Sequence, residues 1–273
     1  MIAPVIDLFW LEQHRAEVVL ADVRWYLDGR SGQAAYEQGH ISGAIFVDLE
    51  HWLSGPGSSF KGRHPLPDPA DFARGMSELG IGDDCTVVAY DDVGGVIAAR
   101  LVWMLRAVGK PAALLDGGIR IYNQPLESGT VSRPRAIFSP TEWPADQIAD
   151  IDDVTDPTKI VLDARNADRY RGEGDHVDPR MGHISGARNL PCRENLTAEG
   201  TFLPADTLRR RFRAVGVSDG AAVISYCGSG VTACHNLLAL ELVGLGGGRL
   251  FPGSWSQYSQ DASRAISTGS SPE

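Results

Sequence analysis

One hexapeptide, GHISGA, occurs twice in the 273-residue chain, at Gly39 to Ala44 and again at Gly182 to Ala187. In each half the motif follows an apolar run that ends in Asp-x-Arg, at Asp22 to Arg24 and at Asp163 to Arg165. An internal repeat of this kind indicates one structural unit that is present twice. We therefore predict two similar domains, and the chain is long enough to give each of them a core of ordinary size.

Four further pairs of residues correspond across the two halves with one constant offset. They are Tyr90 with Tyr226, Asp91 with Cys227, Gly117 with Gly253, and Tyr122 with Tyr258. Residues 123–156, between the copies, contain several prolines and acidic residues with little periodicity, which is typical of a linker. We predict a first domain over residues 1–139, a linker over 140–156 and a second domain over 157–273.

Short β-rich runs alternate with helical patterns in each copy, which favours a parallel sheet flanked by helices. In the first copy the segments are 18–23, 68–79, 86–90, 95–108 and 112–115, and in the second they are 159–162, 204–215, 221–226, 231–245 and 249–251. The prediction is an α/β fold with two tandem domains of the same architecture.

The composition is that of a globular protein, and its charge excludes some partners. Hydrophobic residues make up 43% and charged residues 22% of the chain, and the formal net charge is -10. This acidic balance opposes broad attraction to nucleic acid or to an anionic membrane. The sequence contains no run of about 20 apolar residues and no pattern of a secretory signal, so we expect a cytoplasmic protein.

Cys227 is the strongest candidate for chemistry among the four cysteines. It follows the strand predicted over 221–226 and precedes the helix predicted over 231–245, at the edge of the sheet where open α/β folds place their sites. Gly228 and Gly230 allow a tight loop whose backbone N–H groups turn toward the sulfur. Together with the N-terminal end of the helix, such a loop stabilises a thiolate.

The loop from Cys227 to Thr232, the duplicated GHISGA and the Gly253-Ser254-Trp255 motif together resemble the tandem-domain rhodanese family. The resemblance is closer to its 3-mercaptopyruvate sulfurtransferase branch. It implies a catalytically silent first domain, which fits Asp91 at the position of the cysteine, and a second domain that carries sulfur as a persulfide on Cys227. It also implies a small-molecule sulfur donor, a thiol, cyanide or protein acceptor, and no metal or organic cofactor.

The resemblance also assigns roles to individual residues. Ser229 and Glu50 join Cys227 in catalysis, because Glu50 stands where the family has an aspartate that acts with the loop serine in proton transfer. Arg169 matches the first of two carboxylate-binding arginines, and Arg180 matches the second with a longer spacing. The full set of predicted substrate-binding residues is Arg169, Arg180, His64, Gly228, Gly230, Val231 and Thr232.

The donor follows from the charge of the loop. Thiosulfate-preferring relatives have two basic residues after the cysteine, whereas this chain has Gly228 and Ser229, which favours the single carboxylate of 3-mercaptopyruvate. Structural interpretations remain open: Arg169 could form an ion pair, and Arg180 could be a solvated surface residue. The alternatives are a thiosulfate sulfurtransferase, a non-catalytic sulfur-carrier module and, from another class, a phosphatase. A phosphatase of the class that resembles this family has an arginine at the end of its cysteine loop, whereas in this chain no arginine follows Cys227 until Arg249.

Overall fold

A computed structural model describes residues 2–174 and 177–272, and its contacts group the chain into two compact units. The first unit comprises Met1–Gly55, Pro67–Trp143 and Leu196–Phe202. The second unit comprises Pro56–Leu66, Pro144–Asn195 and Leu203–Glu273. The chain passes from the first unit to the second between Trp143 and Pro144, which is inside the predicted linker. The predicted limits did not anticipate that Pro56–Leu66 belongs to the second unit and Leu196–Phe202 to the first.

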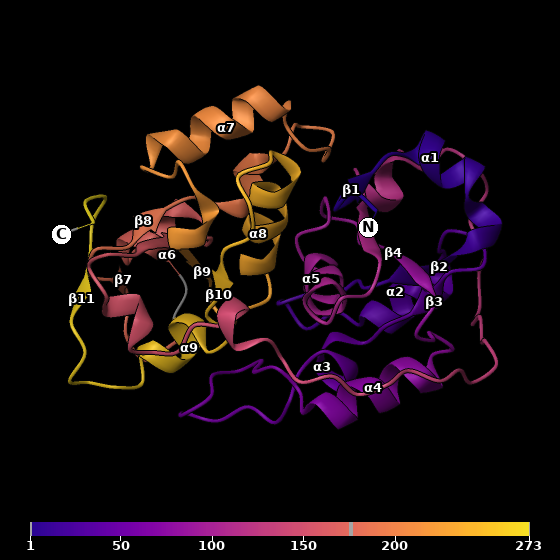
Figure 1. The fold of residues 1–273 in the computed structure, drawn as a ribbon, viewed down its shortest axis with the longest axis horizontal. Helices are drawn as coiled ribbons and strands as arrows, with labels where there is room; N and C mark the ends of the chain where they lie inside the picture. Colours follow the sequence, from indigo (N-terminus) through magenta and orange to yellow (C-terminus); the bar gives the residue numbers. More distant parts are fainter. Residues whose placement is uncertain (1, 175–176, 273) are drawn as a thin grey trace. The chain divides into compact units, whose positions relative to one another are not determined.

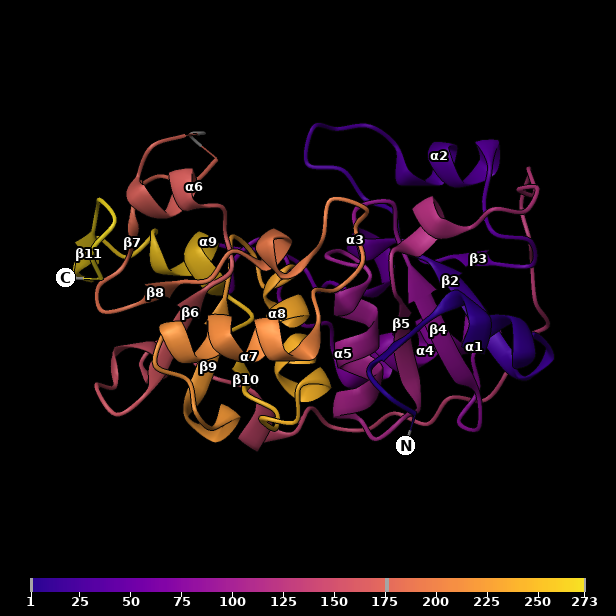
Figure 2. The ribbon, with the colours of Figure 1, turned by 90° about the horizontal axis from the view of Figure 1, so that it is seen from above.

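A five-stranded parallel sheet forms the centre of the first unit, and the order of its strands is β1-β5-β4-β2-β3 (Figures 1 and 2). The strands are β1 (Val5–Ile6), β2 (Val18–Asp22), β3 (Ile45–Phe46), β4 (Thr86–Tyr90) and β5 (Ala112–Leu115). The helices are α1 (Leu8–Gln13), α2 (Gly32–Gln38), α3 (Leu49–Trp52), α4 (Pro69–Glu78) and α5 (Ala99–Ala107). The central strands are rich in β-branched residues and almost wholly buried, as expected of a sheet covered on both faces.

The second unit has a four-stranded parallel sheet in the order β10-β9-β6-β8, and a separate antiparallel pair, β11-β7. The strands are β6 (Ile160–Asp163), β7 (His183–Ile184), β8 (Arg188–Asn189), β9 (Val223–Tyr226), β10 (Arg249–Leu250) and β11 (Ile266–Ser267). The helices are α6 (Ala167–Arg171), α7 (Ala205–Ala214), α8 (Ala233–Leu242) and α9 (Ser254–Tyr258). Helix α8 packs on β9 and β10 (Figure 2).

Within residues 2–174 and 177–272, six short 3-10 helices connect these elements: Arg15–Glu17, Gly118–Ile121, Ala145–Gln147, Asp153–Thr155, Cys192–Asn195 and Gly220–Ala222. The predicted fold class is confirmed, because both units contain a parallel sheet flanked by helices. The strands predicted at 86–90 and 112–115 have those bounds. The helices predicted from 95 and from 231 begin later, at Ala99 and Ala233, because the loops that precede them take up the intervening residues.

The Asp-x-Arg motif makes the same contacts in both units. The Arg24 guanidinium donates to the Asp22 carboxylate and to the Gly39 carbonyl oxygen, both at 2.7 Å. The equivalent Arg165 donates to its own aspartate at 2.6 Å and to the first residue of the second GHISGA at 2.7 Å. All these side chains are buried, so water cannot solvate their charges. The additional hydrogen bonds to backbone carbonyl oxygens stabilise each buried ion pair instead.

A buried tyrosine holds each copy of GHISGA. The Tyr36 hydroxyl donates to the Ala44 carbonyl oxygen at 2.8 Å, and the Tyr170 hydroxyl donates to Ala187 in the same way at 2.7 Å. The repeated motif therefore fixes the turn that leads into the edge strand of each sheet. Its role is structural in both units, including the one without a cysteine.

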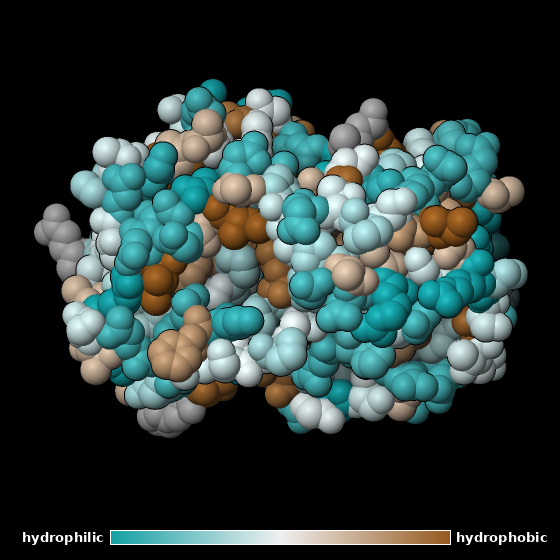
Figure 3. All heavy atoms as spheres, turned by 60° about the horizontal axis from the view of Figure 1, so that its bottom comes forward, coloured by the Kyte–Doolittle hydropathy of each residue, from teal (hydrophilic) through white to brown (hydrophobic). Residues whose placement is uncertain are grey.

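The surface shown in Figure 3 is mainly hydrophilic, with smaller hydrophobic areas between the polar side chains. The large hydrophobic side chains that are exposed among the described residues are Phe9, Leu27, Phe60, Leu126, Ile137, Val177 and Met181. Apart from Val177 and Met181, which share a loop, they come from separate segments, and single exposed apolar side chains are ordinary on a globular protein. No helix in the described part of the chain is long and apolar enough to span a membrane.

Candidate active site

Cys227 directly follows β9 and is 1% exposed. Its backbone N–H donates to the Ser254 hydroxyl at 3.1 Å, and its carbonyl oxygen accepts from the Trp255 N–H at 3.0 Å. Ser254 has a φ of 51°, in the left-handed region that non-glycine residues rarely adopt. The Gly-Ser-Trp motif thus fixes the backbone of the cysteine through a strained turn.

The two glycines of the loop are needed for different reasons. Gly230 has a φ of 76°, and a Cβ on it would lie 2.4 Å from the Pro252 carbonyl oxygen, so a side chain is excluded there. Gly228 is buried, and a Cβ on it would lie 3.2 Å from Arg63 Nη2 and 3.5 Å from Arg169 Nη1. Two guanidinium groups therefore lie beside the residue that follows the cysteine.

Ser229 and His64 lie together in the second unit. The Ser229 hydroxyl is 2.8 Å from His64 Nδ1, and the histidine is 8% exposed. His64 comes from the segment Pro56–Leu66, which packs with the second unit although it precedes the first-unit helix α4 in sequence. The structure thus brings two of the predicted site residues to the cysteine loop, in hydrogen-bond contact with each other.

Arg169, on α6, shares an aspartate with Arg63. Arg63 Nη1 donates to Asp178 Oδ1, and Arg169 Nη2 lies 3.6 Å from Asp178 Oδ2. The Asp178 side chain is 4% exposed, compared with 31% for Arg63 and 19% for Arg169. Sequence reasoning missed Arg63 and Asp178, and the only signal was that each stands next to a motif that carries a predicted residue.

In the first unit, Asp91 occupies the position of the cysteine. Its carboxylate is wholly buried and accepts four backbone hydrogen bonds, from Val93 at 2.8 Å, Gly95 at 2.7 Å, Ile97 at 2.8 Å and Ala98 at 3.0 Å. Loss of solvent raises the pKa of the Asp91 carboxyl, and the four N–H donors offset part of that rise. The loop of the first unit is an anion cradle that the chain fills with its own carboxylate.

Comparison with known proteins identifies the duplicated unit. The family described as "Rhodanese-like domain" matches residues 6–124 and 145–261. The chain belongs to the rhodanese family. A protein of Pseudomonas aeruginosa named "Probable 3-mercaptopyruvate sulfurtransferase" is 40% identical over 269 residues, with 93% of each chain covered. SseB of Mycobacterium tuberculosis, named for thiosulfate sulfurtransfer, is 38% identical, with 92% of this chain and 91% of SseB covered.

Solved structures of this family agree with that relationship. The crystal structure of SseA from Escherichia coli, described as a 3-mercaptopyruvate sulfotransferase, has a TM-score of 0.81 at 33% identity and covers 93% of this chain and 100% of its own. The 3-mercaptopyruvate sulfurtransferase from Leishmania major has a TM-score of 0.85 at 32% identity, over 93% of this chain and 74% of its own. The predicted family is confirmed. The chain is a sulfurtransferase, which takes sulfur from a donor and passes it to an acceptor.

Two residues predicted for this rhodanese site have other contacts. The Arg180 guanidinium donates to the carbonyl oxygens of Tyr258, Ser259, Asp261 and Arg264, at 2.5 to 3.1 Å. These hydrogen bonds use the guanidinium donors to join the end of α9 to the turn that follows it. A contact between Arg180 and substrate stays a prediction without support from this placement.

Glu50 is exposed on α3 and belongs to the first unit. Its Oε1 accepts a hydrogen bond from Trp25 Nε1 at 3.0 Å. Cys227 belongs to the second unit, and no contact between Glu50 and the cysteine loop is described. The role of Glu50 in proton transfer therefore stays a prediction.

The other three cysteines are poor candidates for the nucleophile. Burial raises the pKa of the Cys192 thiol to about 12, which keeps it neutral, and Thr232 of the catalytic loop hydrogen-bonds to it. Cys234 is fully buried on α8, where its thiol donates to the Gly230 carbonyl oxygen at 3.4 Å. Cys85 is half-buried and accepts from a neighbouring backbone N–H at 3.2 Å.

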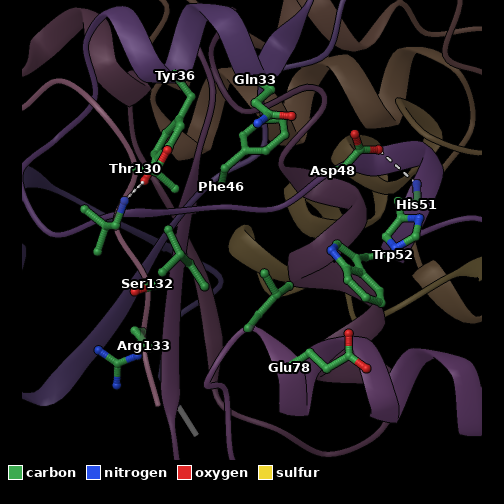
Figure 4. Close-up of a pocket in the computed structure, with 13 residues that line it drawn as sticks. Gln33, Tyr36, Phe46, Asp48, His51, Trp52, Glu78, Thr130, Ser132 and Arg133 are labelled. Atoms are coloured by element: carbon green, nitrogen blue, oxygen red, sulfur yellow. Dashed lines mark hydrogen bonds between the residues drawn. The ribbon is translucent and has the colours of Figure 1, made fainter. Parts of the chain in front are cut away.

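A separate pocket of about 400 Å³ lies in the first unit (Figure 4). Phe46 and Trp52 provide apolar surface, while Glu78 and Arg133 are among the charged residues around it. None of its lining residues, all in the described part of the chain, is a cysteine or a predicted site residue. This pocket is therefore distinct from the cysteine loop, and its described lining offers no thiol.

Proposed function

We propose that this rhodanese transfers a sulfane sulfur from 3-mercaptopyruvate to a thiol or cyanide acceptor through a persulfide on Cys227. The observation that carries the proposal is the placement of Cys227, in a loop that also holds Ser229 against His64 and lies beside Arg63 and Arg169. These groups match three needs of the reaction: a nucleophile, a proton carrier and a site for the carboxylate of the donor.

The first step is attack of the Cys227 thiolate on the sulfur of the donor. A sulfur–sulfur bond forms, the bond between that sulfur and its carbon breaks, and the electron pair goes to the carbon as the enolate of pyruvate. One proton then completes pyruvate. The Ser229 hydroxyl, with His64 behind it at 2.8 Å, is positioned to deliver that proton, because a hydroxyl relays protons well when its partner can replace them.

The persulfide is an anion that the loop must stabilise. Under the offset that relates Asp91 to Cys227, the four N–H donors around Asp91 correspond to those of Ser229, Val231, Ala233 and Cys234. The Cys234 N–H donates to the Val231 carbonyl oxygen, so the first three remain. We assign these N–H groups to the outer sulfur of the persulfide, as preorganised donors of the kind that bind oxyanions. Gly230 and Thr232 complete the turn that orients them.

The second step returns the cysteine. An acceptor thiolate attacks the outer sulfur of the persulfide, and the Cys227 thiolate leaves. With cyanide as the acceptor, the product is thiocyanate. The two half-reactions use the same loop in turn, so the kinetics should be ping-pong.

Arg169 and Arg63 support 3-mercaptopyruvate as the donor, because a guanidinium pair fits one planar carboxylate held away from the reacting sulfur. Gly228 and Ser229 add no charge next to the cysteine. Thiosulfate is the second candidate, and the 38% identity with SseB favours it. We expect a cytoplasmic location on the basis of the sequence.

The two donors are compared by measuring kcat/KM for each with the purified protein at one pH and ionic strength, with cyanide as the acceptor. The proposal expects a clear preference for 3-mercaptopyruvate and release of one pyruvate per thiocyanate. A preference for thiosulfate would replace the donor. Absence of turnover with both donors would leave only a carrier that is loaded by another protein.

A further inference from the structure

Ser256, on α9, contacts both segments that form the proposed proton relay. Its backbone N–H donates to the carbonyl oxygen of Gly228, the residue after the nucleophile, at 2.9 Å. Its hydroxyl accepts a hydrogen bond from the backbone N–H of Arg63, the residue before His64, at 3.0 Å. One residue therefore joins the cysteine loop to the segment Pro56–Leu66.

The orientation of the Ser256 hydroxyl is fixed by a second hydrogen bond. The side chain is 3% exposed, and its hydroxyl donates to the Gly253 carbonyl oxygen at 3.0 Å. With its single proton used in this way, the hydroxyl offers its lone pairs to the Arg63 N–H. The hydrogen bond therefore sets the position of the Arg63 backbone relative to α9.

The segment Pro56–Leu66 approaches α9 closely. A Cβ on Gly62 would lie 2.8 Å from Ser256 Oγ, so only glycine permits this approach. The Gln257 side chain donates to the Phe60 carbonyl oxygen at 2.7 Å. Of the two α9 side chains that bind the segment by these printed hydrogen bonds, Ser256 bonds nearer to the histidine in sequence.

The first unit has a different residue at this position. The offset that relates Asp91 to Cys227 places Arg120 at the position of Ser256. Arg120 is exposed, and its side chain carries no hydroxyl. The hydroxyl is thus present at this position in the unit with the cysteine and absent from the silent one, which favours a role in the reaction over a role in the shared fold.

We infer that Ser256 is a positioning residue, which holds His64 within hydrogen-bond distance of the Ser229 hydroxyl. The inference rests on the proposed function and deepens it by naming the group that aligns the two parts of the proton relay. His64 Nδ1 and Ser229 Oγ are 2.8 Å apart but come from segments that are distant in sequence, so their contact depends on how those segments are joined. Without the Ser256 hydroxyl, the Arg63 N–H loses its acceptor and His64 moves away from Ser229.

The contact itself can be tested without sulfur transfer. The nitrogen-15 chemical shifts of the His64 ring report whether Nδ1 is hydrogen-bonded, and Ser229→Ala supplies the shifts of a ring without this partner. In Ser256→Ala the shifts should move from the wild-type values toward those of Ser229→Ala. Ser256→Thr, which keeps the hydroxyl, should restore them. Wild-type shifts in Ser256→Ala, with circular dichroism to confirm that it is folded, would overturn the inference.

Turnover gives a second readout, which separates positioning from stability. Ser256→Ala should lower kcat with 3-mercaptopyruvate by about tenfold to a hundredfold, because displacing a reacting group by about 1 Å can have an effect of this size. KM should change by about twofold or less, because the Arg63 guanidinium is still bound by Asp178. In the Ser229→Ala background, Ser256→Ala should lower kcat no further, because both changes remove the same contact. Additive losses would mean that Ser256 acts elsewhere, and the inference would be rejected.

The matched control is Ser259→Ala, which removes another buried hydroxyl just after α9. The Ser259 hydroxyl has no hydrogen-bond partner among the described residues. We expect wild-type His64 shifts and wild-type kcat in this variant, and equal losses in both serine variants would overturn the inference. If the wild type used neither donor while Ser256→Ala still moved the His64 shifts, the inference would stand and the proposed function would fail. If the wild type were active and Ser256→Ala changed neither readout, the proposed function would stand and the inference would fail.

Discussion

The loops at the ends of β4 and β9 occupy equivalent places in the two units but hold different groups. In the first, the Asp91 carboxylate is enclosed by four N–H donors. In the second, Cys227 occupies the equivalent place, and its carbonyl oxygen accepts a 3.0 Å bond from Trp255, as that of Asp91 does from Ile119. The anchoring bond is shared, whereas the side chains of the two loops differ, first at Asp91 and Cys227 and also at Val93 and Ser229.

The difference shows how a duplicated fold can divide two tasks. A carboxylate satisfies the donors of its loop permanently, so the first loop contributes to stability and offers nothing to a substrate. A cysteine sulfur is a single atom and a weaker acceptor than the two oxygens of a carboxylate, so we propose that the second loop keeps its donors for a sulfur that arrives with the substrate. On this proposal, catalysis depends on N–H donors that the chain does not fill with a carboxylate of its own.

The largest expected effect comes from removing the sulfur of the second loop. Cys227→Ser should lower turnover by on the order of a thousandfold or more, because serine is a far weaker nucleophile without a base to activate it. Mass spectrometry after incubation with donor should find one added sulfur on the wild type and none on the variant. Cys192→Ser is the control, since that thiol stays neutral, and it should keep the added sulfur. A persulfide on Cys85 or Cys192 would contradict the assignment.

The second-largest effect is expected at Arg169, whose guanidinium lies beside Gly228 of the cysteine loop. Arg169→Ala should lower kcat/KM for 3-mercaptopyruvate by roughly 30-fold to 1,000-fold, the loss of about 2 to 4 kcal/mol for a charge-assisted pair. Arg169→Lys should restore only part of the activity, because lysine keeps the charge but not the bidentate geometry. Arg180→Ala should instead lower the melting temperature, since its four carbonyl partners lie in one turn. Equal losses for both donors in Arg169→Ala would contradict the role of a carboxylate site.

A stability measurement tests the first loop. Asp91→Ala should lower the free energy of unfolding by about 3 to 5 kcal/mol, because it leaves buried N–H groups without an acceptor. Urea unfolding measures this, and Asp84→Ala, at an exposed position, is the control with little expected change. A small loss at Asp91 would show that the loop collapses without its carboxylate.

The same carboxyl predicts a pH dependence with a definite sign. Its pKa is raised above the usual 3.8, so the stability it contributes is full below the unfolded pKa and declines as pH rises through the folded pKa. The difference in unfolding free energy between wild type and Asp91→Asn should therefore shrink from pH 3.5 upward. An increase with pH would mean that the four hydrogen bonds outweigh the loss of solvent.

Local patterns predicted much of this molecule. The repeat, the strand runs and the two glycines of the cysteine loop were sufficient for the fold class and for Cys227, because each depends on a short stretch of sequence. Ser229 and His64 were both predicted, and the structure places them 2.8 Å apart. The resemblance to a known family supplied the two residues, which are distant in the chain, but not the contact between them.

The parts that escaped prediction arise from tertiary contacts. The segment Pro56–Leu66 packs with the second unit, and this exchange places Arg63 against Asp178. Neither residue belongs to a pattern that a strand or helix period reveals. Arg180 matched a family position in sequence, but its donors are taken by backbone carbonyls that only the folded turn after α9 brings together.

The smallest expected effect is a gain of function in the first loop. Asp91→Cys, made in the Cys227→Ser background, should accept sulfur weakly, at roughly a hundredth of the wild-type rate or less, because the loop supplies N–H donors but lacks the rest of the site. Val93 stands where the active loop has Ser229, so no hydroxyl is available to relay a proton. The measurement is the mass of the first-unit cysteine after incubation with donor, compared with Cys227→Ser alone. Adding Val93→Ser should raise the yield if proton relay limits it. Turnover close to that of the wild type would show that the cradle alone is sufficient, and that Asp91 is all that keeps the first unit silent.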